Sequence, residues 1–248
     1  MSTKTLSVGS LFSGIGGIDL GLERAGLKCL WQSEIDPYAC RVLAKHWPDI
    51  PNLGDIRDID WTTVDRADLV AGGYPCQPFS IAGRRAGADD PDNLWPYFAE
   101  CLRVLRPRYA LLENVPNHLS LGFGPVLGDL ASLGYDTEWD CLPAAAVGAP
   151  HLRDRLFAIA RHAGTEHRRT MADRDHPRPD HPLPARRDAS GFGGSTYRPK
   201  PWTPEPDMGR VANGIPHRLD RIRTLGNAVV PQVAEHLAHI ILEMETRP

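Results

Sequence analysis

The chain has 248 residues, 42% of them hydrophobic, and a net charge of −3, enough length and apolar content for one large domain with a buried core. It contains no run of about 18 apolar residues, and MSTKTLSVGSLF has no hydrophobic signal-peptide segment, so we expect a cytoplasmic protein without a membrane partner. Five cysteines without the spacing of a zinc site indicate reduced thiols and no bound metal.

Strand and helix patterns alternate along the chain. In chain order the predicted elements are a strand at 7–12 that runs into the glycine turn SGIGG, a helix ending at Gly26, a strand at 28–34, a helix over roughly 37–46, a strand at 67–73, a helix at 94–107, a strand at 109–115, a helix near 125–133, strands at 135–142 and 155–160, and an amphipathic helix within 224–245. The alternation predicts an α/β fold, with an open, mostly parallel sheet covered by helices on both faces.

Residues 163 to about 208 are rich in proline, glycine and charge and poor in aliphatic side chains, so they can build little core of their own. We therefore predict a main domain over 1–162, a short basic region over 163–215, and a C-terminal helix over 216–248 that returns to the main domain.

Basic residues concentrate in the later part of the chain. Residues 151–223 hold 15 basic and 9 acidic side chains, whereas the first 150 residues hold 12 and 19. The asymmetry indicates either a face for a polyanion or a solvated, irregular surface segment.

A single cysteine is displayed in the stretch GGYPCQPFS, residues 72–80. Cys76 stands between Pro75 and Gln77, with Pro78 two places on, and neither proline suits a helix interior or a central strand. We expect a stiff, exposed turn at the end of the 67–73 strand. In an open α/β sheet the carboxyl ends of the strands form the ligand site, and Glu113 also falls at such an end.

The first turn, FSGIGGID, is not the dinucleotide fingerprint, because Asp19 stands where the third glycine would be. Its glycines still bring bare backbone close to a ligand at a helix N-terminus. Glu34 follows the second strand, where an acid can bind ribose hydroxyls, and Asp55, placed after a third predicted strand, can accept an adenine amino group. Together these features predict an adenosine site without phosphates.

The elements FSGIGG, SEID, GDI, GGYPCQPFS, ENV, an Arg-x-Arg pair and GNAVVP occur in this order. In this order they resemble the DNA (cytosine-5-)-methyltransferase family, over roughly residues 7–161 and 209–245, and the compact form resembles its phage and prophage members. The resemblance implies a Rossmann-like S-adenosylmethionine-dependent methyltransferase fold and a target-recognition role for 163–215. It also implies S-adenosyl-L-methionine as methyl donor, S-adenosyl-L-homocysteine as product, double-stranded DNA as substrate, and no metal.

The resemblance assigns catalysis to Cys76, Glu113, Arg153 and Arg155. The Cys76 thiolate would add to carbon 6 of cytosine, which makes carbon 5 nucleophilic toward a methyl group. Glu113 would hold nitrogen 3 of the base protonated or hydrogen-bonded, helped by a raised pKa, and the two arginines would orient the base. Asn114 would brace the cysteine loop.

The resemblance further implies contacts to the two ligands. The expected cofactor-binding residues are Phe12, Gly14, Ile15, Gly16, Gly17, Glu34, Ile35, Asp55, Ile56, Pro75, Asn227 and Val229. Because the target carbon is out of reach inside a duplex, the base must be flipped into the pocket. The expected DNA-binding residues are Ser80, Arg84, Arg85, Arg186, Arg187 and Arg198. For all of these, core packing, capping or plain surface charge is the structural alternative.

The sequence departs from the family in two places. His151 precedes the Arg-x-Arg pair where the family usually has glutamine, which suggests altered tuning of the site. The recognition region between Ala163 and Met208 is much shorter than usual, and few base-reading candidates remain in it. Such a reader is expected to recognise a short or relaxed target, or to fold only on DNA.

Two other functions stay open from the sequence. The tRNA-methylating branch of the family shares the catalytic loop, although the CFT tripeptide that marks it is absent here. A catalytically silent module that binds DNA and cofactor would explain the short recognition region, but it would need no nucleophile at Cys76. We expect a monomer and consider a cognate restriction enzyme a possible partner.

Overall fold

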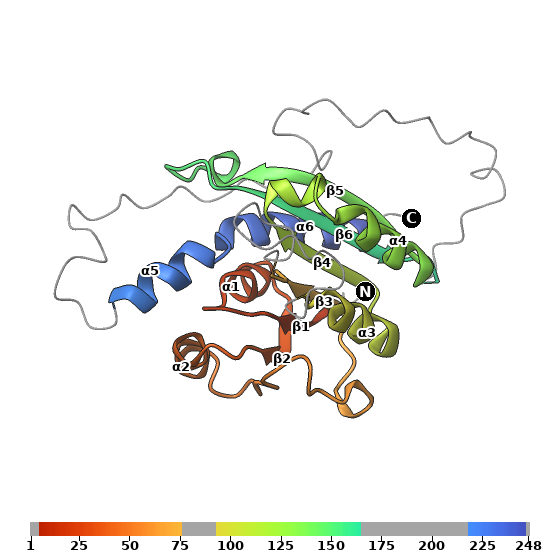
Figure 1. The fold of residues 1–248 in the computed structure, drawn as a ribbon, viewed down its shortest axis with the longest axis horizontal. Helices are drawn as coiled ribbons and strands as arrows, with labels where there is room; N and C mark the ends of the chain where they lie inside the picture. Colours follow the sequence, from red (N-terminus) through yellow and green to blue (C-terminus); the bar gives the residue numbers. More distant parts are fainter. Residues whose placement is uncertain (1–4, 76–92, 165–217, 247–248) are drawn as a thin grey trace.

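The computed structural model describes residues 5–75, 93–164 and 218–246, which contain one six-stranded sheet flanked by helices (Figure 1). The strands are β1 (Ser7–Leu11), β2 (Lys28–Ser33), β3 (Leu69–Gly72), β4 (Tyr109–Asn114), β5 (Tyr135–Pro143) and β6 (Asp154–His162). The α-helices are α1 (Gly17–Arg24), α2 (Pro37–His46), α3 (Trp95–Leu105), α4 (Phe123–Ser132), α5 (Arg218–Asn227) and α6 (Pro231–Thr246). The predicted α/β class is confirmed.

The strand order β2-β1-β3-β4-β6-β5 combines parallel and antiparallel pairs. β1 pairs in parallel with β2 and with β3, and β3 pairs in parallel with β4. β6 runs antiparallel to both β4 and β5. After β2 the chain returns to the other side of β1 to form β3, so the connections diverge at the carboxyl ends of β1 and β3, where open α/β sheets bind ligands.

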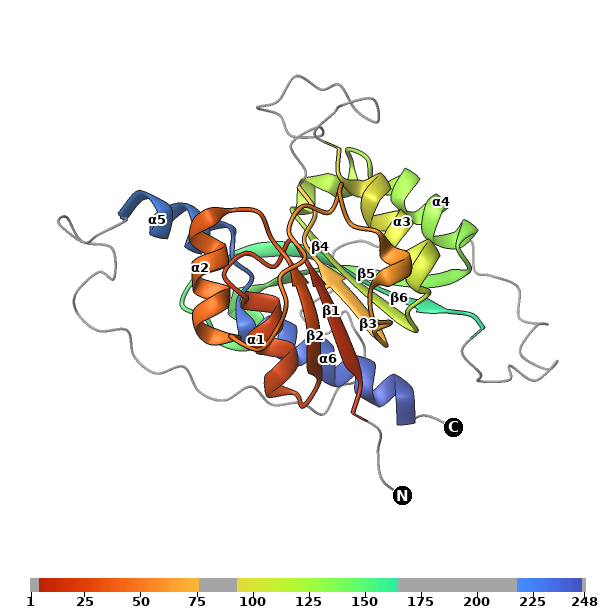
Figure 2. The same cartoon turned by 90° about the horizontal axis from the view of Figure 1, so that it is seen from below.

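Helices cover both faces of the sheet, α1 and α6 on one and α3 and α4 on the other (Figure 2). The side chains of β3 alternate between these layers: Leu69 and Ala71 pack with α1 and α6, and Val70 packs with α3 and α4. All four residues of β3 are buried, as expected for a central parallel strand. The core therefore holds the carboxyl end of β3, from which the cysteine turn departs, in a fixed place.

Helix α6 lies against α1 through glycines that leave no room for a side chain. A Cβ atom at Gly21 would lie 2.3 Å from the carbonyl oxygen of Pro231 and 2.5 Å from the Cβ of Ala234. A Cβ atom at Gly17 would lie 2.3 Å from the carbonyl oxygen of Val229. The contact brings the residues that open α6 beside the glycine turn, although more than 200 residues separate them in the chain.

Two elements differ from the sequence prediction. No third strand precedes Asp55; the described chain has a single bridge there, between Gln32 and Asn52, because the prolines at 48 and 51 cannot donate to a ladder. The C-terminal helix predicted over 216–248 is instead two helices, α5 and α6, which are separated at 228–230, just before Pro231. In α5, Leu219 and Leu225 are both exposed. The predicted boundaries after 162 and 215 stay predictions, because residues 165–217 lie outside the described ranges. Among the described helices, none is long and apolar enough to cross a membrane.

The α1–α6 contact yields a stability test. Gly21→Ala should lower the free energy of unfolding by about 1–3 kcal/mol, because the added methyl group meets backbone that cannot move aside. Gly128→Ala in α4 is the matched control: no atom of the described residues lies within 4 Å of its Cβ position, so alanine should raise the stability by about 0.4–1 kcal/mol. Urea unfolding measures both, and equal effects of the two variants would contradict the packing argument.

Candidate active site

The turn after β1 shapes the first wall of the site. Phe12, Gly14 and Gly16 all have positive φ, at 52°, 56° and 80°, so the backbone coils tightly between β1 and α1. Among the described residues, the one atom within 4 Å of a Cβ built at Gly14 is the carbonyl oxygen of Phe12, at 4.0 Å, so no described side chain packs against this glycine. A Cβ at Gly16 would instead strike the ring of Trp47, 2.4 Å away. Gly14 therefore suits close approach of a ligand, whereas Gly16 is needed for packing.

Asp19, which replaces the third glycine of a dinucleotide fingerprint, holds this turn from behind. Its buried carboxylate accepts hydrogen bonds from Ser10 Oγ at 3.0 Å and Gln32 Nε2 at 2.8 Å. Ser10 Oγ also lies 2.9 Å from Ser13 Oγ, within the turn itself. Burial raises the pKa of Asp19, and the hydrogen bonds from Gln32 and Ser10 oppose this. The network joins β1, β2 and α1 beneath the turn.

Glu34, directly after β2, is fixed by backbone donors. Its Oε2 accepts from the N–H of Gly14 at 2.7 Å, and its Oε1 accepts from the N–H groups of Ile35 and Asp36 at 2.9 and 2.8 Å. Charge-assisted bonds of this kind are short and strong. They hold the carboxylate against the glycine turn, a contact that the sequence does not predict.

Asp55 and Ile56 form the opposite wall. Ile56 is buried, and Asp55 accepts from Arg57 Nε at 2.9 Å. The hydrogen bonds from Arg57 hold the pKa of Asp55 below its usual value. The carboxylate is therefore charged at neutral pH and partly committed to its own neighbour, a pairing that the sequence analysis did not include.

At the other end of the site, Glu113 near the end of β4 forms an ion pair with Arg155, with Oε1 3.0 Å from Nε. Burial raises the pKa of Glu113 to about 7, while the charges of Arg155 and Arg153 act in the opposite direction. A Cβ at Gly73 would lie 2.4 Å from Glu113 Oε2, so the carboxylate occupies the place of a side chain at 73. Glu113 can therefore carry a proton at neutral pH.

The two arginines of the Arg-x-Arg pair have different partners. Arg153 donates to the carbonyl oxygens of Gly226 and Ala228, at 2.8 and 2.5 Å, and so anchors the segment before α6. Arg155 reaches Glu113. Arg153 itself has a positive φ of 32°, directly before β6. The sequence predicts one task for both arginines, the orientation of the base.

The residues on either side of 76–92 are held together. Asn114 Nδ2 donates to the carbonyl oxygen of Tyr74 at 3.1 Å, and the Tyr74 hydroxyl lies 2.8 Å from His118 Nε2. The rings of Tyr74 and Trp95 stand 5.2 Å apart, and Trp95 Nε1 donates to Asp129 Oδ2 at 2.7 Å. Of these contacts, only the bracing role of Asn114 is predicted from the sequence. Tyr74 lies within GGYPCQPFS, but the sequence predicts no role of its own for it, and His118 lies outside the motifs named above.

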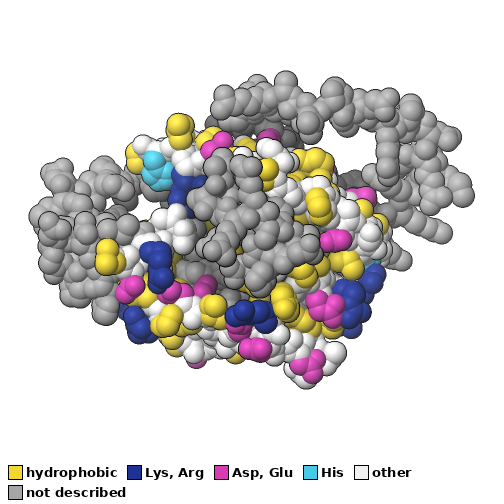
Figure 3. All heavy atoms as spheres, in the orientation of Figure 1, with side chains coloured by type: hydrophobic (Ala, Val, Ile, Leu, Met, Phe, Trp, Pro, Cys, Tyr) yellow, Lys and Arg dark blue, Asp and Glu magenta, His cyan; other side chains and the backbone are white. Residues whose placement is uncertain are grey.

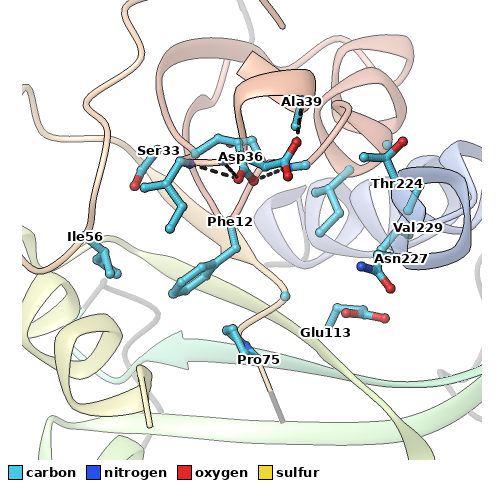
Figure 4. Close-up of a pocket in the computed structure, with 18 of the residues that line it drawn as sticks. Phe12, Ser33, Asp36, Ala39, Ile56, Pro75, Glu113, Thr224, Asn227 and Val229 are labelled. Atoms are coloured by element: carbon cyan, nitrogen blue, oxygen red, sulfur yellow. Dashed lines mark hydrogen bonds between the residues drawn. The ribbon is translucent and has the colours of Figure 1, made fainter. Parts of the chain in front are cut away.

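These walls enclose a cavity of about 410 Å³ (Figure 4). Of the residues expected to bind a cofactor, the lining includes Phe12, Gly14, Gly17, Glu34, Ile35, Asp55, Ile56, Pro75, Asn227 and Val229. Ile15 and Gly16 do not line it. The lining also includes residues that the sequence analysis missed, which are Ser13, Ile18, Ser33, Asp36, Ala39, Gly54, Gly73, Leu94, Arg223, Thr224 and Ala228. Glu113 closes the cavity on the side where the cysteine turn begins.

Several expected residues lie outside the described ranges. They are Cys76, Ser80, Arg84, Arg85, Arg186, Arg187 and Arg198, so the structure does not test their roles. On the face drawn in Figure 3, the described basic and acidic side chains are interspersed rather than gathered into one patch. His151 is exposed just before β6.

Comparison with known proteins gives consistent results. The family model described as C-5 cytosine-specific DNA methylase matches residues 6–192. The Type II methyltransferase M.NgoMIV of Neisseria gonorrhoeae is 39% identical over 153 residues, which cover 60% of this chain and 49% of that protein. The Type II methyltransferase M.Eco47II of Escherichia coli is 37% identical over 168 residues, 64% of this chain and 40% of that protein.

A solved structure shows the same fold. It is a putative DNA modification methyltransferase encoded within an E. coli prophage, with a TM-score of 0.55 and 30% sequence identity, over 64% of this chain and 47% of that one. The chain thus spans less than half the length of each of these three relatives.

The buried carboxyl at the end of β4 gives a pH test. Because the folded-state pKa of Glu113 lies near 7, above the ordinary 4.5, folding favours the protonated form. Its stabilising contribution is complete below pH 4.5 and is lost as the pH rises through 7. Relative to Glu113→Gln, which stays neutral, the wild type should therefore lose up to about 3 kcal/mol of unfolding free energy across this window.

Urea unfolding of both proteins at a series of pH values measures this difference. Arg155→Gln is the companion variant: removing the cation that lowers the pKa of Glu113 should move the loss to higher pH. A stability difference between wild type and Glu113→Gln that does not change with pH would contradict the buried-acid assignment.

Proposed function

The chain belongs to the C-5 cytosine-specific DNA methylase family, and on that premise we propose that it transfers a methyl group from S-adenosyl-L-methionine to carbon 5 of cytosine in double-stranded DNA. One observation carries the proposal. A single cavity joins the glycine turn, the acid after β2 and the segment before α6 to Glu113 and to Pro75, the residue before Cys76. The pocket proposed for the cofactor and Glu113, the acid proposed to activate the base, therefore belong to the same cavity.

The lining fits S-adenosyl-L-methionine. The side chains of Phe12 and Ile56 offer apolar surface to a nucleobase, and Glu34, held by three backbone donors, keeps lone pairs for ribose hydroxyls. Gly14 offers bare backbone, and the glycine turn has Asp19 where a dinucleotide fingerprint has its third glycine, which favours an adenosine ligand without phosphates. When bound, S-adenosyl-L-methionine supplies an electrophilic methyl group on a sulfonium whose positive charge suits the acidic lining.

The chain's own residues then activate the base. The Cys76 thiolate adds to carbon 6 of a flipped cytosine, forming a carbon–sulfur bond and placing electron density on carbon 5. Glu113, with a pKa near 7, holds a proton at nitrogen 3 and so draws electrons from the ring during this addition. Arg155 fixes the Glu113 carboxyl through the 3.0 Å contact. Once carbon 5 carries the methyl group, loss of its proton and departure of the thiolate restore the aromatic ring.

Other parts of the chain have supporting roles in this proposal. Arg153 acts through the backbone, holding Gly226 and Ala228 so that Asn227 and Val229 line the cavity. Target recognition is assigned to residues 163–215. A monomeric state and a cognate restriction enzyme stay predictions, and the Type II methyltransferase names of the relatives bear only on the restriction enzyme.

The test is transfer of tritiated methyl groups from S-adenosyl-L-methionine to mixed-sequence duplex DNA and, in parallel, to tRNA. Wild-type protein should label duplex DNA, and Cys76→Ser should reduce the label by at least about 10³-fold, because the hydroxyl is a far weaker nucleophile at neutral pH. Cys141→Ser, a partly buried cysteine on β5, is the matched control and should keep the activity.

Three other outcomes would each contradict a part of this proposal. Label in tRNA instead of DNA would indicate that tRNA is the substrate and would leave the proposed transfer chemistry unchanged. Binding of S-adenosyl-L-homocysteine without transfer to either nucleic acid would indicate a silent binding module. Equal label from wild type and Cys76→Ser would refute the covalent mechanism.

A further inference from the structure

Helix α5, which lies within the span predicted as a C-terminal helix, brings the basic residue Arg223 to the lining of the cavity. Thr224 and Asn227 of the same helix lie on the side of the cavity opposite Ile56 (Figure 4). In the described lining Arg223 is the only lysine or arginine. The cofactor residues expected from sequence include no cation either.

The rest of the charged lining is acidic. Glu34, Asp36, Asp55 and Glu113 all face the same cavity. An acidic surface favours the sulfonium and the ammonium group of S-adenosyl-L-methionine, but it repels the α-carboxylate of the same molecule. A bound amino-acid tail therefore needs a cation beside its carboxylate, because a desolvated charge without a partner is strongly unfavourable.

An ion pair holds Arg223 in position, and it leaves some of the N–H donors of the guanidinium available. Its Nη2 contacts Asp36 Oδ2, and Asp220 Oδ1 lies 3.8 Å from the same nitrogen. The other oxygen of Asp36 caps α2 by accepting from the N–H groups of Tyr38 and Ala39, both at 2.9 Å. A guanidinium has five N–H donors, and within the described ranges only those on Nη2 have an acceptor. The ion pair thus fixes the side chain at the cavity while Nε and Nη1 stay available.

We propose that Arg223 binds the α-carboxylate of the methionine part of the cofactor. The inference rests on the proposed function, since it assumes that the cavity takes S-adenosyl-L-methionine. The apolar side of the cavity suits the nucleobase, so the amino-acid tail extends toward Thr224, Asn227 and Arg223. Arg223 thereby distinguishes the amino-acid-bearing cofactor from a simple nucleoside.

A purely structural role makes a different prediction. If the Arg223–Asp36 pair only fastens α5 to α2, removing it would weaken the binding of every ligand of the cavity alike. A carboxylate contact, in contrast, is lost only by ligands that have the carboxylate. Two ligands that differ in this one group therefore separate the two roles.

The experiment is calorimetric titration of the purified chain with S-adenosyl-L-homocysteine and with the analogue in which hydrogen replaces the α-carboxylate. Arg223→Gln should weaken the binding of S-adenosyl-L-homocysteine by about 10- to 100-fold, the usual cost of a lost charged hydrogen bond. It should leave the affinity for the carboxylate-free analogue within about twofold of wild type. Arg223→Lys keeps the charge without the planar fork and should fall between the two. Arg221→Gln, an exposed arginine on the same helix that does not line the cavity, should change neither affinity.

The outcomes separate the two proposals. Equal weakening of both ligands by Arg223→Gln, or no weakening of either, would overturn the carboxylate contact while leaving the cofactor assignment intact. Failure of the wild-type chain to bind either adenosine ligand would instead overturn the proposed function of the cavity.

Discussion

The contact between α1 and the start of α6 depends on two positions without side chains, and the site is built on that contact. At both Gly17 and Gly21, a Cβ atom would lie 2.3 Å from a carbonyl oxygen of the C-terminal segment, so only glycine fits at either position. Arg153 fastens the same segment from the other side, through Gly226 and Ala228. As a result, residues from the two ends of the chain close one cavity. The positions of the residues that line this cavity therefore depend on this packing rather than on their neighbours in the sequence.

The two ends of the cavity hold carboxyl groups in different surroundings. Near the glycine turn, Glu34 is held by backbone N–H groups, which stabilise its negative charge. At the far end Glu113 is buried, and desolvation outweighs the opposing charge of Arg155, so its pKa rises to about 7. Two carboxylates with different surroundings can therefore perform different tasks, one binding hydroxyl groups as an anion and one presenting a proton.

The segment before the cysteine turn shows how the sheet positions a group on a loop. Tyr74 bonds to His118 and Asn114 and packs on Trp95, so the chain leaves β3 along a defined path. His118 and Asn114 both come from the region where β4 ends. Pro75, the last described residue before Cys76, and Glu113 are therefore held by the same two strands. Under the proposed mechanism this would favour a constant geometry between the nucleophile and the acid that assists it.

The alternating elements, the turn at Gly14 and most of the strand-end residues that line the cavity could be predicted from the sequence. They follow from local chemistry: hydrophobic periodicity, the tolerance of glycine for φ > 0, and the rule that parallel strands bring their carboxyl ends together. Three features could not be predicted: the packing of Gly16 on Trp47, the different partners of Arg153 and Arg155, and the approach of Arg223 to the cavity. Each of these depends on a contact between residues far apart in the chain, and such a contact leaves no periodic signal in the sequence.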